Sequence, residues 1–307
     1  MPDLQQFGFQ ALWSPFALIF TVLIGILYLY VTGPMREKFK DAEPVPLKRK
    51  LLFFSGLALL YLALAGPLNL LAHLMFTYHM LAMAIAFLAA PPLVLLGIPA
   101  WLLRPLFKIT FVKKASKVLL NPILTLLMFN GMFSFYHLPV IMDTVMTNYA
   151  LHYFIYALLL FAAFCMWWPV IDPVPELGTL THLKKMGYMF ANGVLLTPAC
   201  AMIIFAPEPL FQMYNDPMVW AKALGYCVPG DPQLLLQLFQ GPENFSLMPP
   251  RDDQQLGGIV MKFMQEIMYG SILAYNFKLW YRSEHPEDDE PDDPAALKRH
   301  YEQLNNA

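Results

Sequence analysis

The chain has 307 residues, of which 58 % are apolar and only 14 % are charged, and its formal net charge is −2 at pH 7. In soluble globular domains about a quarter of all residues are charged, so this composition excludes an ordinary soluble domain and indicates a membrane protein. No basic stripe of the kind that binds nucleic acid is present, so we expect no nucleic-acid partner.

Seven apolar segments are each long enough to cross the hydrocarbon core of a bilayer, which takes about 20 mostly apolar residues in a helix. In chain order they are Leu12–Val31, Leu51–Leu71, Leu74–Gly97, Leu119–His137, Tyr149–Ile171, Lys185–Ala206 and Leu256–Trp280. The sequence therefore predicts an all-α integral membrane protein with a seven-transmembrane-helix bundle over residues 1–282. An acidic tail over residues 283–307 follows the bundle. We expect the lipid bilayer to be the first partner of the protein.

The Lys and Arg residues predict how the bundle is oriented, because cytoplasmic loops are enriched in both. Most of the 20 lie in the odd-numbered loops or after the last span, so we expect the N-terminus outside and the C-terminus in the cytoplasm. The N-terminus shows no basic n-region and no small-residue cleavage site. We therefore expect the first span to be retained rather than removed as a signal peptide.

Residues 207–255 form the only long loop, and the predicted orientation places this loop outside. Loops of this length in compact proteins are usually functional or disordered. Within it, Asp231–Gln240 has the pattern of a short amphipathic helix lying on the bilayer. We expect a partly ordered lid or docking surface above the outer helix ends.

Four of the seven histidines fall at helix ends on this outer side: His73, His79, His137 and His152. Ionisable groups in or at the edge of a bilayer are costly, so they are functional candidates. Any one of them could instead be a hydrogen-bonding residue at the membrane interface. Four on one face favour a cluster, and imidazole beside the thioethers of a chain with 19 methionines suits a soft transition metal, Cu(I) above all.

The third span is expected to begin near His73 and to carry His79 as well. On one helix these two side chains would lie about 9 Å apart along the axis and about 120° apart around it. A single helix therefore cannot chelate one metal ion through both of them. Other helices, or a second subunit, would have to complete each site.

Methionine and aspartate side chains on the same and neighbouring spans are further candidates as ligands. Helical spacing adds the metal candidates Met80, Met83, Met132 and Met261, although methionine is also a common gap filler in apolar cores. Asp253 shares a helix face with Gly257 and Met261, so it could orient a ligating imidazole or pair with Arg251. The glycines beside it would permit close helix approach.

The remaining polar candidates have simpler interpretations. Cys165 and Cys200 lie within spans and fit small packing residues, whereas Cys227 is a lone thiol in the outer loop, with an intermolecular disulfide as the alternative. Lys262 and Glu266 are an i, i+4 pair in the last span. They are either a structural ion pair inside the bundle or part of a proton- or ion-linked step.

Several runs of residues together resemble the multi-span bacterial CtaG family of cytochrome c oxidase assembly factors. The resemblance covers nearly the whole chain, and the runs are His73–Met80, Tyr136–Pro139, Trp167–Pro173, Leu196–Cys200, Asp253–Gly258 and Gln265–Gly270. It implies a non-enzymatic role in the bacterial plasma membrane, namely delivery of copper to the buried copper site of a haem-copper oxidase. The four histidines and Asp253 match motif positions, and the implied partners are an oxidase subunit, an extracytoplasmic copper donor and, by analogy, a second copy in a homodimer.

Two other functions remain open at this point. A haem-handling protein would use His73 or His79 with His137 or His152 as a pair of axial ligands. A seven-helix membrane receptor would share the topology, although nothing in the short cytoplasmic loops suggests a signalling partner. An intramembrane hydrolase is disfavoured, because the sequence has neither GxSxG nor HExxH.

Overall fold

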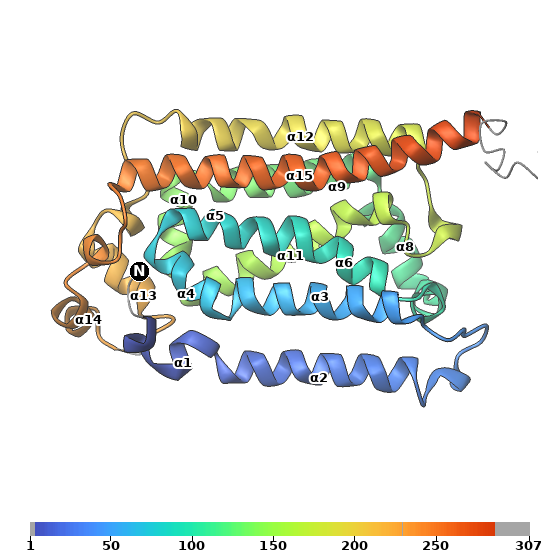
Figure 1. Cartoon of the computed structure of the whole chain (residues 1–307), viewed down its shortest axis with the longest axis horizontal. Helices are drawn as coiled ribbons and strands as arrows, with labels where there is room; N and C mark the ends of the chain where they lie inside the picture. The colour runs from blue at the N-terminus through green and yellow to red at the C-terminus, as the bar shows by residue number, and fades with distance from the viewer. Residues whose placement is uncertain (1–3, 229, 286–307) are drawn as a thin grey trace, which may run out of the picture.

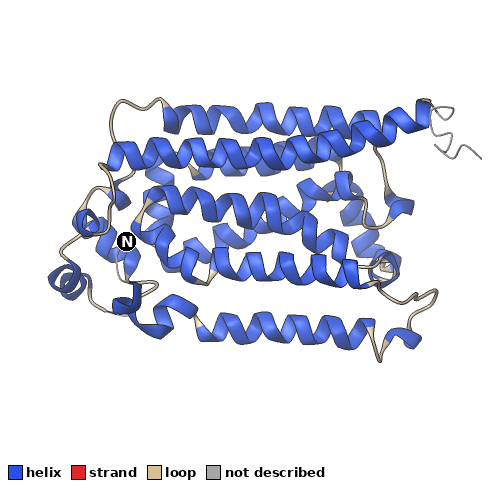
Figure 2. Ribbon diagram, in the orientation of Figure 1, coloured by secondary structure: helices blue, strands red, loops and turns tan. Residues whose placement is uncertain are grey.

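The computed structural model describes residues 4–228 and 230–285, and within these ranges every regular element is a helix and no strand occurs (Figure 2). The all-α prediction is therefore confirmed. The predicted acidic tail lies outside the described residues from position 286 onward.

Within the described residues, five helical segments are long and apolar enough to cross a membrane, which identifies the chain as a multi-pass membrane protein. They are α2 (Pro15–Thr32), α3 (Leu47–Leu64) with α4 (Pro67–Leu74), α5 (Phe76–Ala84) with α6 (Ala90–Gly97), α11 (Tyr149–Ile171) and α12 (His182–Ile204). A sixth span is possible in length if α8 (Thr110–Leu119) and α9 (Pro122–Tyr136) count as one, but these two helices meet at 69°.

The last predicted span belongs to α15 (Pro250–Glu284), the longest helix in the described ranges, which packs alongside α12 (Figure 1). Lys262, Gln265 and Glu266 lower the hydropathy of its central part, so α15 is not among the helices that meet the length and hydropathy requirement. All seven predicted segments thus fall on helices, whereas the number of spans stays at five or six and the topology remains a prediction.

The two ends of the bundle differ in construction (Figure 1). At one end lie α8, the loop between α2 and α3, and the end of α15, where the basic side chains gather. At the other end lie α1 (Gly8–Trp13), α4, α10 (Pro139–Met146), α13 (Pro217–Leu224) and α14 (Pro232–Phe239). The loop predicted over residues 207–255 ends at residue 249, because α15 begins at Pro250. Residues 207–249, here called the outer segment, contain short helices, and α14 corresponds to the short helix predicted at Asp231–Gln240.

The outer segment is held to the bundle by a small apolar core of its own. Trp220 and Leu224 of α13 and Phe245 are buried against Phe7 and Leu70. Asp231 caps α14 by accepting a hydrogen bond from the backbone N–H of Gln233 at 2.9 Å. The segment therefore forms a packed cover over the ends of α4 and α5.

A proline pair in the third span shows how the bundle supplies hydrogen-bond partners to backbone groups that lack one. Pro91 has no N–H, so the carbonyl of Phe87 loses its usual helical donor, and the chain forms a π-helical turn over Ile85–Ala89. The indole Nε1–H of Trp167 on α11 donates to that carbonyl at 3.1 Å. Because water is absent from a bilayer core, a neighbouring helix has to supply such donors.

The two glycines of the last predicted span do permit close helix approach. A Cβ atom at Gly257 would lie 2.6 Å from the Phe76 ring on α5, and one at Gly258 would lie 2.7 Å from Ile204 on α12. Both distances are shorter than a van der Waals contact, so α15 can sit against α5 and α12 only with glycine at these positions.

We expect Gly257→Ala to destabilise the protein by about 1–3 kcal/mol, because overpacking forces Phe76 off its position. Gly270→Ala is the matched control on the same helix, since nothing lies within 4 Å of the added Cβ. Thermal unfolding in detergent should show a lower midpoint for the first variant and an unchanged or higher midpoint for the second. Equal midpoints would show that α15 has room to move.

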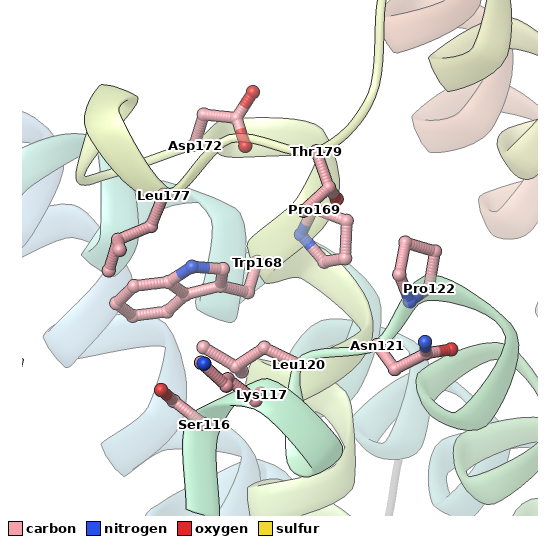
Figure 3. A pocket seen from close by; sticks show the side chains of 10 residues that line it. All are labelled: Ser116, Lys117, Leu120, Asn121, Pro122, Trp168, Pro169, Asp172, Leu177 and Thr179. Atoms are coloured by element: carbon pink, nitrogen blue, oxygen red, sulfur yellow. The ribbon is translucent and has the colours of Figure 1, made fainter. Parts of the chain in front are cut away.

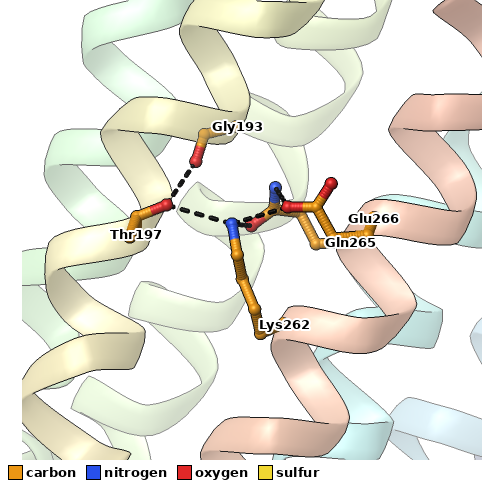
Figure 4. Close-up of polar contacts among 5 residues, drawn as sticks. All are labelled: Gly193, Thr197, Lys262, Gln265 and Glu266. Carbon is orange, nitrogen blue, oxygen red and sulfur yellow. Dashed lines mark hydrogen bonds and ion pairs between the residues drawn. The ribbon is translucent and has the colours of Figure 1, made fainter.

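The ion pair predicted on the last span forms, but it is not enclosed by the bundle (Figure 4). Lys262 Nζ lies 2.7 Å from Glu266 Oε1, while 30 % of the Lys262 side chain and 61 % of the Glu266 side chain remain exposed. Lys262 also donates to Thr197 Oγ1 at 3.0 Å and so bridges α15 to α12. The interpretation as a pair inside the bundle is therefore wrong, because these residues face outward between the two helices.

Candidate metal centre

His73 and His79 lie on two helices rather than on one. Helix α4 ends at Leu74, Met75 is extended with φ −140° and ψ 138°, and α5 begins at Phe76. The expectation that one helix carries both histidines was therefore wrong. The break lets the two imidazoles take positions that the spacing of a single helix would not allow.

Asp253 explains why the chain breaks at this point. Its carboxylate accepts hydrogen bonds from the backbone N–H groups of Phe76, at 2.6 Å, and of Thr77, at 3.1 Å. The first N–H groups of a helix have no partner within it, and the helix dipole favours a negative charge there. The carboxylate on α15 thus caps α5, and the Thr77 hydroxyl adds a bond of 3.0 Å to the backbone carbonyl of Asp253. The sequence pattern predicted this carboxylate beside an imidazole or Arg251, whereas in the structure it binds the backbone of α5.

One histidine pair consists of His73 and His152, here called the outer pair. The ring centroids are 5.9 Å apart. His73 Nδ1–H donates to the carbonyl of Asn69 at 2.8 Å, and the His152 ring stacks on Tyr156 with a centroid distance of 4.2 Å. Residues from α4 and α11, far apart in the sequence, therefore meet at the end of the bundle that the outer segment covers.

The other pair consists of His79 and His137, here called the inner pair. Their ring centroids are 6.0 Å apart, and both residues are almost completely buried. His137 follows the last residue of α9, and its Nδ1–H donates to the carbonyl of Phe133 at 2.8 Å. His79 also interacts electrostatically with His73, His137 and His152, so the two pairs are neighbours.

Each of the four imidazoles keeps one ring nitrogen without a partner. The buried, unpartnered atoms are Nε2 of His73, His79 and His137 and Nδ1 of His152. Buried polar atoms in proteins almost always have a hydrogen-bond partner, so four such nitrogens in one place require an explanation. In His73 and His137 the carbonyl bond fixes the proton on Nδ1, which leaves Nε2 with a free lone pair, the form that binds a metal ion.

The arrangement is two pairs rather than one cage. In the described ranges, no three His, Cys, Asp or Glu side chains converge as ligands of a single metal ion. A closed tetrahedral site of the zinc type would need four such ligands. Two neighbouring imidazoles, each with an unpartnered nitrogen, suit a soft ion of low coordination number, which the donor preferences of Cu(I) satisfy.

Tyrosines surround the inner pair. The Tyr136 ring lies 6.0 Å from that of His79 and 4.9 Å from that of His137. Its hydroxyl donates to Met146 Sδ at 3.3 Å and lies 3.3 Å from the Tyr156 hydroxyl. These tyrosines and Met146 could not be predicted from the sequence, because neither residue type is distinctive in a membrane protein until its neighbours are known.

The outer segment closes over this group. Tyr214 is buried 6.4 Å from His79 between ring centroids and donates its hydroxyl to the Ala72 carbonyl at 2.6 Å. Burial above all, and then the nearby Tyr156, Asp253 and Asp143, raise the pKa of Tyr214 well above its usual value, so the phenol stays neutral.

Asp143 of α10 holds the turn that precedes Tyr214. Its carboxylate accepts the N–H groups of Gln212 and Met213, each at 3.1 Å. Burial raises the pKa of the Asp143 carboxyl, and these two hydrogen bonds oppose the rise.

The four methionines predicted as ligands occupy packing positions. Met80, Met83 and Met261 are buried in the main apolar core, and Met132 packs against that core. Met80 Cγ would lie 3.2 Å from a Cβ at Gly257, which places Met80 at the contact between α5 and α15. Their assignment as metal ligands stays a prediction, and Met146 is the thioether that the structure connects to the inner pair through Tyr136.

Cys227 is the residue of the outer segment that lies closest to the outer pair. Its Sγ is 3.5 Å from His73 Nδ1, and Asn69 Nδ2–H donates to the same sulfur at 3.7 Å. No spacing rule could have found this contact, because 154 residues separate Cys227 from His73 in the chain. A pocket of about 290 Å³ is lined by His73, His152 and Cys227 together with Asn69 and Tyr226.

The opposite end of the bundle has a pocket of a different character (Figure 3). It measures about 220 Å³ and is lined by Trp168, Lys117 and Asn121, with Asp172 at its edge. Lys185 binds Asp172 at 2.5 Å, so that carboxylate already has a partner. No histidine lines the pocket, and its side chains offer no set of soft donors.

Comparison with known proteins gives one match. A family model described as cytochrome c oxidase caa3 assembly factor (Caa3_CtaG) matches residues 26–283. This range contains all four clustered histidines, Cys227 and Asp253. No curated protein and no solved structure matches the chain.

Proposed function

We propose, because the chain belongs to the Caa3_CtaG family of cytochrome c oxidase caa3 assembly factors, that it binds Cu(I) at the outer end of its helix bundle and delivers it to the oxidase. The bundle would lie in the bacterial plasma membrane with its histidines on the extracytoplasmic side. The observation that carries this proposal is the set of four buried imidazole nitrogens without partners, arranged as two pairs.

Copper is favoured over haem by what surrounds the inner pair. The Phe133 ring lies 4.2 Å from the His137 ring, and the rings of Phe76 and Tyr136 lie within about the same reach of His79, at 5.7 and 6.0 Å. Two histidines could serve as axial ligands of a haem only if a flat macrocycle fitted between them. Packed aromatic side chains fill that volume, whereas a single ion needs no such slot.

The proposed role is binding and transfer without a chemical reaction. The histidines supply neutral nitrogen donors, the carbonyl bonds of Asn69 and Phe133 orient two of them, and the tyrosines keep water away. Copper would arrive from an extracytoplasmic donor and pass to an oxidase subunit in the same membrane. Both pairs are complete within one chain, so binding itself requires no second copy.

The proposal is tested in cells that make a caa3-type oxidase. A strain without this protein should assemble oxidase with normal haem but little copper, and the wild-type gene should restore the copper. A gene carrying His79→Ala and His137→Ala should fail to restore it, whereas His182→Ala should succeed, because His182 lies at the opposite end and contacts Asn276. Copper content is measured on purified oxidase by elemental analysis.

Two outcomes would contradict the proposal in different ways. Normal oxidase activity in the deletion strain would remove the role in assembly and would favour a receptor. Oxidase that lacks haem rather than copper would favour a haem-handling function.

A further inference from the structure

Cys227 lies at a position from which its sulfur can bind a metal ion. It follows α13 in the outer segment, and its backbone N–H bonds to the carbonyl of Leu224 at 2.9 Å, which fixes the turn. The side chain is only partly buried and borders the pocket of about 290 Å³ described above. The other two cysteines, Cys165 and Cys200, are buried within α11 and α12.

The imidazoles that share this pocket are independent signs of a ligand. His73 is 2 % exposed with Nε2 unpartnered, and His152 is 8 % exposed with Nδ1 unpartnered. Both rings line the same pocket as the Cys227 thiol. Both rings are buried although they line this pocket, so their unpartnered nitrogens are not simply hydrated by bulk water. Buried polar atoms usually have a partner, and a bound ligand would supply one.

We infer that Cys227 supplies a sulfur donor to a Cu(I) site at this pocket, here called the mouth site, beside His73 and His152 and separate from the inner pair. The inference rests on the proposed function and adds a ligand to it. Cu(I) favours soft sulfur ligands, and a single ion needs only two of the three donors, in keeping with the absence of a three-ligand cluster among the described residues.

The binding step balances without a change of oxidation state. As a bond forms between Cys227 sulfur and Cu(I), the bond between sulfur and hydrogen breaks and the proton leaves to water. The ion loses one ligand of its donor for each ligand that it gains here, and copper remains Cu(I) throughout. Because the thiolate is the ligand, a disulfide or an alkylated sulfur at position 227 would block the mouth site while leaving the inner pair intact.

The mouth site has a position suited to accept copper from outside. Its pocket is lined by residues of the N-terminal region, such as Gln10 and Ser14, and by Tyr226 of the outer segment, so it opens away from the bundle core. The inner pair, by contrast, is enclosed by Tyr214 and Phe76. A copper ion that comes from the donor therefore reaches Cys227 before it reaches His79.

The test uses the full-length protein in detergent under anaerobic conditions, with ascorbate rather than a thiol as reductant. Cu(I) should slow alkylation of Cys227 by N-ethylmaleimide at least tenfold, and the variant with His79→Ala and His137→Ala should show the same protection. Cys227→Ser should hold the Cu(I) of the mouth site at least tenfold more weakly in competition with bicinchoninate, because the two imidazoles that remain lack the sulfur donor. Cys200→Ser is the matched control and should bind as the wild type does.

The possible results separate the two proposals. If the wild type binds Cu(I) but Cys227 reacts equally fast with and without the ion, the sulfur ligand is refuted and the histidine function stands. If no variant and no wild-type protein binds Cu(I), the proposed function itself fails. A thermal unfolding midpoint for Cys227→Ser equal to that of the wild type would show that a loss of copper reflects the ligand and not the fold.

Discussion

Replacing His73, His79 and His137 together by alanine should abolish Cu(I) binding to the purified protein. The wild type is expected to bind one ion at each pair, and the triple variant removes both imidazoles of the inner pair and one of the outer pair. Of the candidate ligands at the outer pair, His152 and the Cys227 thiol remain, and without His73 these two should not hold the ion against a competing chelator. We expect an affinity loss of more than about 100-fold, the upper range for even indirect changes at metal sites.

The measurement is a titration with Cu(I) in competition with bicinchoninate, with His182→Ala as the control. Retained stoichiometry in the triple variant would reject these histidines as ligands. The absorption spectrum of the same preparation provides a second check, because a Soret band would indicate bound haem. We expect the purified protein to show none.

Asp253→Asn should destabilise the protein and weaken copper binding together. The carboxylate caps α5 through two charge-assisted hydrogen bonds, and the amide can replace only part of that interaction. Hydrogen bonds to charged groups contribute about 1.5–3 kcal/mol, so we expect a loss of that order in the free energy of unfolding. His79 lies within the first turns of α5, so its imidazole should lose its fixed position as the cap weakens.

Asp252→Asn is the matched control, because Asp252 is the exposed neighbour of the 2 % exposed Asp253. Thermal unfolding in detergent and Cu(I) competition are measured on both variants. If Asp253→Asn lost copper at an unchanged unfolding midpoint, Asp253 would be a direct ligand rather than a residue that positions α5. If neither property changed, the cap would be dispensable.

The sequence predicted the helices well, because a run of apolar residues marks each span. The segment predicted at Tyr149–Ile171 coincides with α11, and the gathering of four histidines at one end followed from counting spans. The pattern could not show whether the last helix crosses the membrane, since Lys262 and Glu266 interrupt an apolar run in a helix that still forms without a break.

The local geometry of the centre was beyond reach for a physical reason. Nothing between Leu70 and Met83 is a helix breaker, and the interruption at Met75 is imposed by Asp253, which lies more than 170 positions away in the chain. Periodicity also assigned Met80 and Met261 to a metal, although apolar packing uses the same spacing. Cys227 and Tyr214 come from the outer segment, whose fold no periodic pattern describes.

The burial of His79 and His137 affects how long an ion would stay bound as well as how tightly it would bind. Both imidazoles are at most 1 % exposed, and the Tyr214 phenol packs beside His79 in the turn that Asp143 holds. An ion seated between those rings could leave only when that turn lifts, so its dwell time would be set by the opening rate of the cover instead of by the strength of two nitrogen bonds. Weak ligands can then hold a cargo safely until an acceptor that lifts the cover arrives.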